Sequence, residues 1–153
     1  MPHLWLDLEE TLINNWDEGQ SIYLADKVVR WFKRRNHVIK TINIFSFAIY
    51  DDKDKNDFEI RLKDDIEDLF DWDISQYPSV EEIRATVFKY ENIQYDSQHE
   101  FIQLNGKHWA FVKFCLMQPA GTYYLIDDTV PTLEIIDKTK NIKICLLNVN
   151  RDI

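Results

Sequence analysis

The stretch LWLDLEETL, residues 4–12, is a short apolar run that turns abruptly acidic. An apolar run of this length with polar flanks predicts a buried strand, here over residues 3–8. Side chains alternate along a strand, so Asp7 and Glu9 are expected on the same face. A strand that ends in two carboxylates is either a solvated strand end or part of a site for phosphoryl transfer. The remaining sequence is needed to distinguish these two interpretations.

Similar apolar runs recur along the chain and alternate with segments of helical periodicity. The runs rich in β-branched and aromatic residues predict further strands over 38–49, 122–128 and 141–149, with 95–104 as an extended segment before a turn at Asn105-Gly106. The helical spacing of apolar residues predicts helices over 20–35, 56–71, 78–92, 107–117 and 132–138. This alternation predicts an α/β fold, a Rossmann-like three-layer sandwich with a mainly parallel central sheet and helices on both faces.

Length and composition predict a single domain over residues 1–153. A hydrophobic content of 45% provides enough apolar side chains for a core, and only three glycines argue against long flexible linkers. The segment 51–92 is dense in charge and helical in pattern. It is interpreted either as an acidic helical insertion or as a small cover over the domain.

A net charge of −9 disfavours binding to duplex nucleic acid or to an anionic membrane, because like charges repel. No segment reaches the roughly 18 consecutive apolar residues that a membrane helix needs. The N-terminus has no basic region of the kind that opens a signal peptide. Cys115 and Cys145 lie in apolar runs, as buried thiols do in a reducing compartment. We therefore expect a soluble, cytoplasmic protein.

Polar side chains that could take part in catalysis or metal binding follow several of the predicted strands. In a parallel sheet the carboxyl ends of the strands meet at one edge, where ligands bind, and Asp7, Ser46 and the pair Asp127-Asp128 all lie at such ends. Phosphoryl transfer to a carboxylate needs a nucleophile, a proton donor and a cation. Asp7 is the candidate nucleophile and Glu9 the candidate acid and base. The acidic side chains would hold Mg²⁺, which prefers oxygen ligands.

Three further side chains complete this candidate site. Thr11 would hold the turn after Asp7 by a hydrogen bond, and the hydroxyl of Ser46 would bind a phosphate oxygen. A lysine would pair with both the nucleophile and the phosphate. Lys107 and Lys113 lie on the same predicted helix, and Lys107 is preferred because it follows a turn.

The order of these motifs resembles that of the haloacid dehalogenase-like phosphohydrolases. Residues 7–12, DLEETL, resemble their first motif, Asp-x-Asp-x-Thr-Leu. Ser46 after TINIF resembles the second motif, and Lys107 the third. Residues 124–129, YLIDDT, resemble the fourth motif, an apolar strand that closes on two acids. The residue usage and small size are also similar to those of short members of this superfamily that are encoded by tailed bacteriophages.

The resemblance implies a short, cap-less Rossmann-like domain, an aspartyl-phosphate intermediate on Asp7 and Mg²⁺ as cofactor. It further implies that the side chains of Asp7 and Asp128 and the backbone carbonyl of Glu9 bind the metal, with Asp127 beside it. Glu9 departs from the motif, because the family has Asp there and Glu is one methylene longer. A proton donor misplaced by about 1 Å can cost about 10²-fold in rate.

The function predicted on this basis is a Mg²⁺-dependent phosphatase that hydrolyses a phosphate monoester. The substrate would be a small metabolite, a nucleotide or a nucleic acid end, and the acidic composition favours a small phosphorylated molecule. The alternative is a catalytically weak or inactive relative that acts as a binding or interaction protein. Glu9 and the dense acidic segment 51–73 are the reasons for it. Transfer of phosphate to an acceptor other than water stays open beside hydrolysis.

Overall fold

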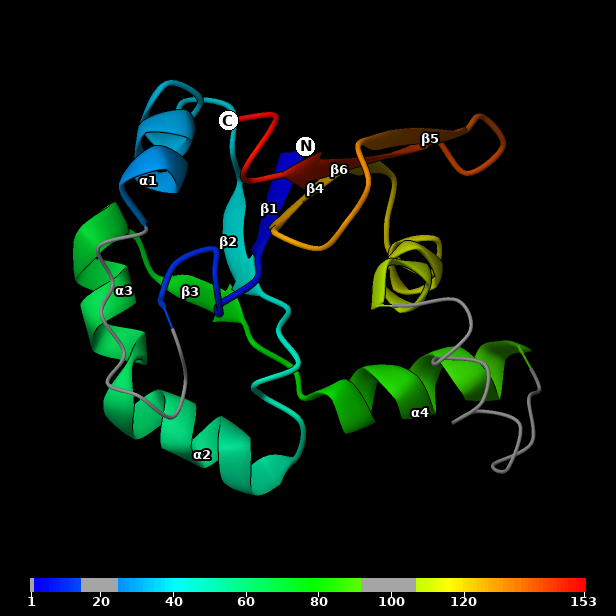
Figure 1. Cartoon of the computed structure of the whole chain (residues 1–153). Coiled ribbons are helices and arrows are strands. Elements are labelled where there is room, and N and C mark those ends of the chain that lie inside the picture. Colours follow the sequence, from blue (N-terminus) through cyan, green and yellow to red (C-terminus); the bar gives the residue numbers. More distant parts are fainter. Residues whose placement is uncertain (1, 15–24, 92–106) are drawn as a thin grey trace.

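A computed structural model describes residues 2–14, 25–91 and 107–153, and its centre is a six-stranded sheet (Figure 1). The strand order is β3-β2-β1-β4-β6-β5. Every pairing is parallel except that of β5 with β6, which is antiparallel. The strands are β1 (Pro2–Leu6), β2 (Thr41–Ile44), β3 (Ile74–Gln76), β4 (Gly121–Asp127), β5 (Leu133–Asp137) and β6 (Ile142–Asn148).

Helices lie on both faces of the sheet (Figure 1). One face carries α1 (Asp26–Lys33), α2 (Asp52–Arg61) and α3 (Lys63–Phe70). The other face carries α4 (Val80–Glu91) and a further helical segment over 107–115. This arrangement confirms the predicted α/β Rossmann-like sandwich with a mainly parallel sheet.

Each face of the sheet has its own hydrophobic core. The side chains of β1 alternate between them, with Leu4 and Leu6 in the core under α1, α2 and α3 and Trp5 in the core under α4 and 107–115. This alternation follows from the two-residue period of a strand. A central parallel strand that is covered on both faces is apolar at successive positions, which explains the continuous run at residues 4–6.

The central strand β1 lies at the point where the strand order reverses. It pairs with β2 on one side and with β4 on the other. The chain fills the sheet from β1 through β2 to β3 and then returns to place β4 and β6 on the opposite side. In open α/β sheets the crevice at the carboxyl ends of such strands is the usual ligand site.

Two of the predicted elements differ in length from the structure. The single helix expected over 56–71 is wrong, because the helix is interrupted at Leu62, whose φ of −131° and ψ of −30° are not helical. The strand expected over 38–49 is shorter, because a turn follows it in which the Ile49 amide donates to the Ser46 carbonyl at 3.1 Å. The short strand β3 was not predicted.

The helix expected over 132–138 is also wrong, because this segment forms strand β5. It pairs with β6 from Leu133↔Leu146 to Asp137↔Ile142, and the hairpin turns at Asn141, which adopts a left-handed φ of 57°. The predictions for 20–24, for 95–104 and for the turn at Asn105-Gly106 lie outside the described residues.

No helix among the described residues is both long and apolar enough to cross a membrane.

Candidate active site

Asp7 directly follows β1 and is held in the sheet by its backbone. Its amide donates to the Ile126 carbonyl at 3.1 Å, while the Phe45 amide donates to the Leu6 carbonyl at 2.9 Å. Asp7 therefore sits between the ends of β2 and β4, and its side chain is buried. The Thr11 hydroxyl donates to Asp7 Oδ2 at 3.3 Å, as expected from the sequence.

The turn after Asp7 is closed by its own backbone. The Leu8 carbonyl accepts from the amides of Thr11, Leu12 and Ile13 at 3.2, 2.8 and 3.0 Å. Glu10 adopts a left-handed φ of 60° within this turn. Repeated bonds to one carbonyl return the chain over the end of β1, which brings Thr11 back to Asp7.

The second acidic pair follows β4, the neighbour of β1. Asp127 is fully buried, and its Oδ1 accepts from both the amide and the hydroxyl of Thr129, at 2.8 and 2.9 Å. The Asn148 side chain donates to the carbonyls of Asp128 and Val130, at 3.1 and 3.0 Å, and so ties this loop to the end of β6.

Lys107 joins the two acidic strand ends. Its Nζ donates to Asp7 Oδ1 at 2.8 Å and lies 2.6 Å from Asp127 Oδ2. The side chain is only 11% exposed, so this ion pair is nearly dehydrated. Of the two lysines considered for the site, Lys107 is therefore the one that the structure brings to Asp7.

Asp7, Asp127 and Asp128 form a group that fits a hard cation. Each offers a carboxylate oxygen, and these oxygens all lie within 4.8 Å of one another. When ionised, three carboxylates carry three negative charges against the one positive charge of Lys107, so a divalent cation would neutralise the group. Oxygen donors are the ligands that Mg²⁺ prefers. The carboxylate of Glu9 is not a member of this group.

The pKa values of the group reflect a shortage of positive charge. Burial raises the pKa of Asp7 in spite of Lys107, and burial together with a hydrogen bond to Asp7 raises the pKa of Asp128 to about 7. Burial is the largest single influence on Asp127 and would raise its pKa, but the charge and hydrogen bond of Lys107 together with the hydrogen bonds from Thr129 lower this pKa. Burial opposes the charge of Lys107, yet the two carboxylates raise its pKa.

Ser46 and Glu9 lie at the same edge of the sheet. Ser46 is buried two residues beyond the end of β2, and its hydroxyl accepts from the Ala48 amide at 3.2 Å. Glu9 is partly exposed and bridges to Ile13 in the turn after Asp7. The turn after β1, the end of β2 and the end of β4 therefore lie next to one another at this edge of the sheet.

Two aromatic rings beside Lys107 were not predicted as part of the site. The Lys107 Nζ lies 5.4 Å from the ring centroids of both Phe45 and Phe47. Phe45 is buried, whereas Phe47 is 42% exposed. In the sequence these residues belong to an apolar run. Nothing in that run indicates that they contact a helix some sixty positions later.

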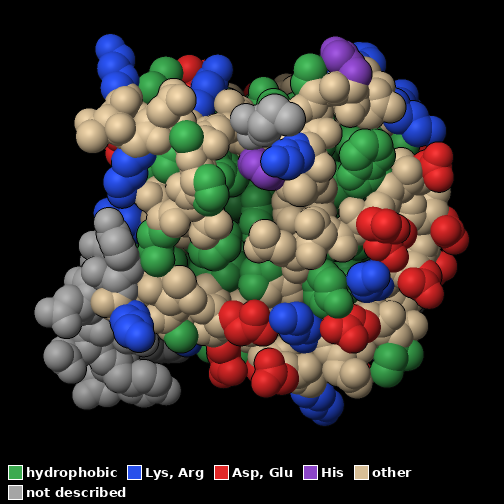
Figure 2. Space-filling model, turned by 180° about the vertical axis from the view of Figure 1, so that it is seen from behind, with side chains coloured by type: hydrophobic (Ala, Val, Ile, Leu, Met, Phe, Trp, Pro, Cys, Tyr) green, Lys and Arg blue, Asp and Glu red, His purple; other side chains and the backbone are tan. Residues whose placement is uncertain are grey.

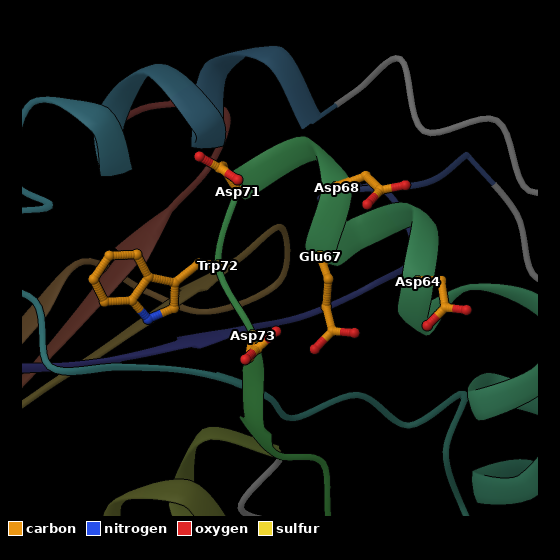
Figure 3. Close-up of a pocket in the computed structure, with 6 residues that line it drawn as sticks. All are labelled: Asp64, Glu67, Asp68, Asp71, Trp72 and Asp73. Carbon is orange, nitrogen blue, oxygen red and sulfur yellow. The ribbon is translucent and has the colours of Figure 1, made fainter.

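A second acidic feature lies away from this site. It is a pocket formed by α3 and by the turn into β3, lined by Asp64, Glu67, Asp68, Asp71, Trp72 and Asp73 (Figure 3). The surface over α2 and α3 is rich in acidic side chains with lysines between them (Figure 2). The pocket is at the amino end of β3, whereas Asp7 follows the carboxyl end of β1 in the same parallel sheet. Glu67 has a structural role there, because it accepts from Lys63 Nζ and from the Ile74 amide at 3.1 and 2.8 Å.

The chain matches no family model, no curated protein and no solved structure.

Proposed function

We propose that this protein is a Mg²⁺-dependent phosphatase of the haloacid dehalogenase-like kind, which hydrolyses a phosphate monoester through an aspartyl-phosphate on Asp7. The observation that carries this proposal is the bridge from Lys107 to Asp7 and Asp127, with Asp128 in the same carboxylate group. At the point where the strand order reverses, this bridge brings three groups together. Asp7 is the nucleophile, the ammonium group of Lys107 can pair with phosphate oxygens, and the carboxylates offer oxygen ligands to a metal.

Mg²⁺ would be held by Asp7, Asp127 and Asp128, with the backbone carbonyl of Glu9 as the further ligand that the motif implies. The fit rests on the chemistry and charge of the three carboxylates. Bound there, a divalent cation would offset negative charge on the phosphate and favour the ionised form of the carboxylates.

In the first step, a carboxylate oxygen of Asp7 attacks phosphorus and the bond from phosphorus to the ester oxygen breaks. Glu9 donates its proton to the departing alkoxide, which leaves as an alcohol. Lys107 pairs with a phosphate oxygen, and the Ser46 hydroxyl is the candidate donor to another. Thr11 orients Asp7 through its hydrogen bond to Oδ2.

In the second step, water attacks the phosphorus of the aspartyl-phosphate. Glu9, now ionised, takes the proton of that water, and the acyl phosphate bond breaks to release inorganic phosphate. Asp7 is restored as a carboxylate. The same residue thus acts first as an acid and then as a base.

The test is phosphate release from a panel of phosphate monoesters, nucleotides included, with Mg²⁺ and with chelator. We expect release only with Mg²⁺, and we expect Asp7→Asn to lower it by about 10³-fold or more while the protein stays folded. Substantial activity in Asp7→Asn would contradict the assignment of the nucleophile.

Glu9 supplies a second, more specific test. Glu9→Gln should lower the rate by about 10² to 10⁴-fold, because it removes the acid and base, whereas Glu9→Asp should keep or raise the rate. If the folded wild-type protein binds Mg²⁺ but releases phosphate from no ester, the binding-protein alternative replaces the phosphatase.

A further inference from the structure

Phe47 places an exposed apolar ring beside the candidate active site. Isolated exposed apolar residues are common and carry no meaning by themselves. Phe47 differs because its ring centroid lies 5.4 Å from the Nζ of Lys107, which itself lies 2.8 Å from Asp7. A phosphate bound between Asp7 and Lys107 would have this ring as a neighbour.

The ring of Phe47 packs against a second aromatic ring. The ring of Phe45 meets it edge to face, with centroids 6.3 Å apart and an interplanar angle of 85°. Phe45 is in turn stacked on Phe111 in the core, at 5.7 Å and 29°. This series of rings runs from the interior to the surface and ends at Phe47.

The backbone around Phe47 is also fixed. Ser46 precedes it, and the Ser46 hydroxyl accepts from the Ala48 amide at 3.2 Å. The Ser46 carbonyl accepts from the Ile49 amide at 3.1 Å. The turn that places the candidate phosphate-binding hydroxyl therefore also places the aromatic ring.

We infer that Phe47 is a stacking platform for a flat aromatic group carried by the substrate, so that the preferred ligand is a phosphate monoester with an aromatic organic part. This inference rests on the proposed function for the position of the phosphate. Aromatic rings attract one another in stacked or edge-to-face arrangements, and a flat ring would cover the apolar surface that Phe47 leaves in water. A nucleoside monophosphate has this chemistry, since its base extends beyond the phosphate by the length of the sugar.

The test compares two esters that differ only by the aromatic group, adenosine 5′-monophosphate and ribose 5-phosphate. For each, kcat/KM is measured with Mg²⁺ on the wild-type protein and on Phe47→Ala, Phe47→Tyr and Ile60→Ala. Ile60 is 75% exposed on α2 and serves as the control for loss of an exposed apolar side chain.

We expect the wild-type protein to prefer adenosine 5′-monophosphate. Phe47→Ala should lower its kcat/KM by about 5- to 150-fold, the range for loss of one base–aromatic stack, and change that of ribose 5-phosphate by less than about 2-fold. Phe47→Tyr should keep the preference, and Ile60→Ala should leave both values unchanged. Because both esters are measured on one preparation, their ratio is independent of any unfolded fraction.

Equal rates for the two esters in the wild-type protein, or an equal loss for both in Phe47→Ala, would overturn the inference while the phosphatase stands. If neither ester is hydrolysed, the phosphatase is judged on the full panel of esters, and the role of Phe47 is tested by measuring the binding of the same two compounds by calorimetry. Tighter binding of adenosine 5′-monophosphate that is lost in Phe47→Ala would support the platform, and equal binding would reject it.

Discussion

Lys107 shows how one side chain holds this site together before any ligand binds. It bridges Asp7 and Asp127, both buried, at 2.8 and 2.6 Å. Burying an ion costs free energy that only a well-placed partner offsets. The lysine therefore has a stabilising part in the empty site as well as the part proposed for it in binding phosphate.

Lys107→Met should consequently destabilise the metal-free protein. Removing one partner of a buried ion pair leaves the other charge uncompensated, which costs about 3–5 kcal/mol. Urea unfolding in the presence of chelator, followed by circular dichroism, measures the change in the free energy of unfolding. The double variant Lys107→Met with Asp7→Asn should lose less than the sum of the two single losses.

Lys113→Met provides the matched control on the same helix. Because Lys113 lies outside the three-aspartate group, its replacement should cost less than about 1 kcal/mol, the range of surface ion pairs. If Lys107→Met were as stable as the wild-type protein, the bridge would not stabilise the empty site.

The positions of the acidic residues at strand ends could be predicted from the sequence, but the contacts between the side chains of the candidate site could not. An apolar run that turns acidic is a local pattern, so Asp7 and Asp127 could be placed at strand ends from the sequence. The lysine bridge joins Lys107 to Asp7 across a separation of 100 residues. Spacing along the chain therefore favoured Lys107 over Lys113 only through the turn before it, and it gave no indication of Phe47.

At the scale of elements, β5 shows where local patterns fail. Leu133 and Ile136 are three positions apart, as on a helix face, yet both are exposed, at 42% and 58%. The segment is a strand because it pairs along its length with β6. That pairing is a tertiary interaction, and strand propensity depends strongly on such context.

The break between α2 and α3 has a similar origin. The apolar stripe expected on one helix over 56–71 does exist, since Phe58, Leu62, Ile66 and Phe70 are all buried in the core under α1, α2 and α3. A continuous stripe nevertheless permits a change of direction at Leu62, whose backbone is not helical. The sequence therefore predicted which face is buried but not where the helix ends.

The start of α2 gives a prediction at this scale. Asp51 is extended, and its side chain accepts from the Asp54 amide at 2.9 Å, which satisfies one of the free amides at the helix start. Asp51→Ala should lower the free energy of unfolding by about 1 kcal/mol, and Asp51→Asn should keep most of it. Thermal or urea unfolding of the three proteins measures this.

Asn56→Ala is the control inside the same helix. Asn56 is exposed, and Ala has the higher helix propensity, so this change should leave stability equal or slightly higher. A loss in Asn56→Ala as large as that in Asp51→Ala would show that the capping bond is not the cause.

At the scale of the whole molecule, one sheet separates two cores. The core under α1, α2 and α3 contains Phe58 and Trp31, and the core under α4 and 107–115 contains Phe111 and Trp5. Neighbouring residues of β1 enter different cores. Unfolding of either core would therefore displace β1 and disturb the other core. The prediction of a single domain over 1–153 can therefore be tested as a prediction of a single unfolding transition.

Phe58→Ala and Phe111→Ala should each lower the free energy of unfolding by about 3–5 kcal/mol, because each empties a fully buried aromatic site. Incorporation of 5-fluorotryptophan allows the resonances of Trp31 and Trp5 to report the two cores separately by ¹⁹F NMR during urea unfolding. If the chain is one cooperative unit, both resonances change at one urea concentration, and either substitution shifts both together. Ile60→Ala should shift neither. A shift of Trp31 alone in Phe58→Ala, with Trp5 unchanged, would mean that the two faces of the sheet unfold as separate units.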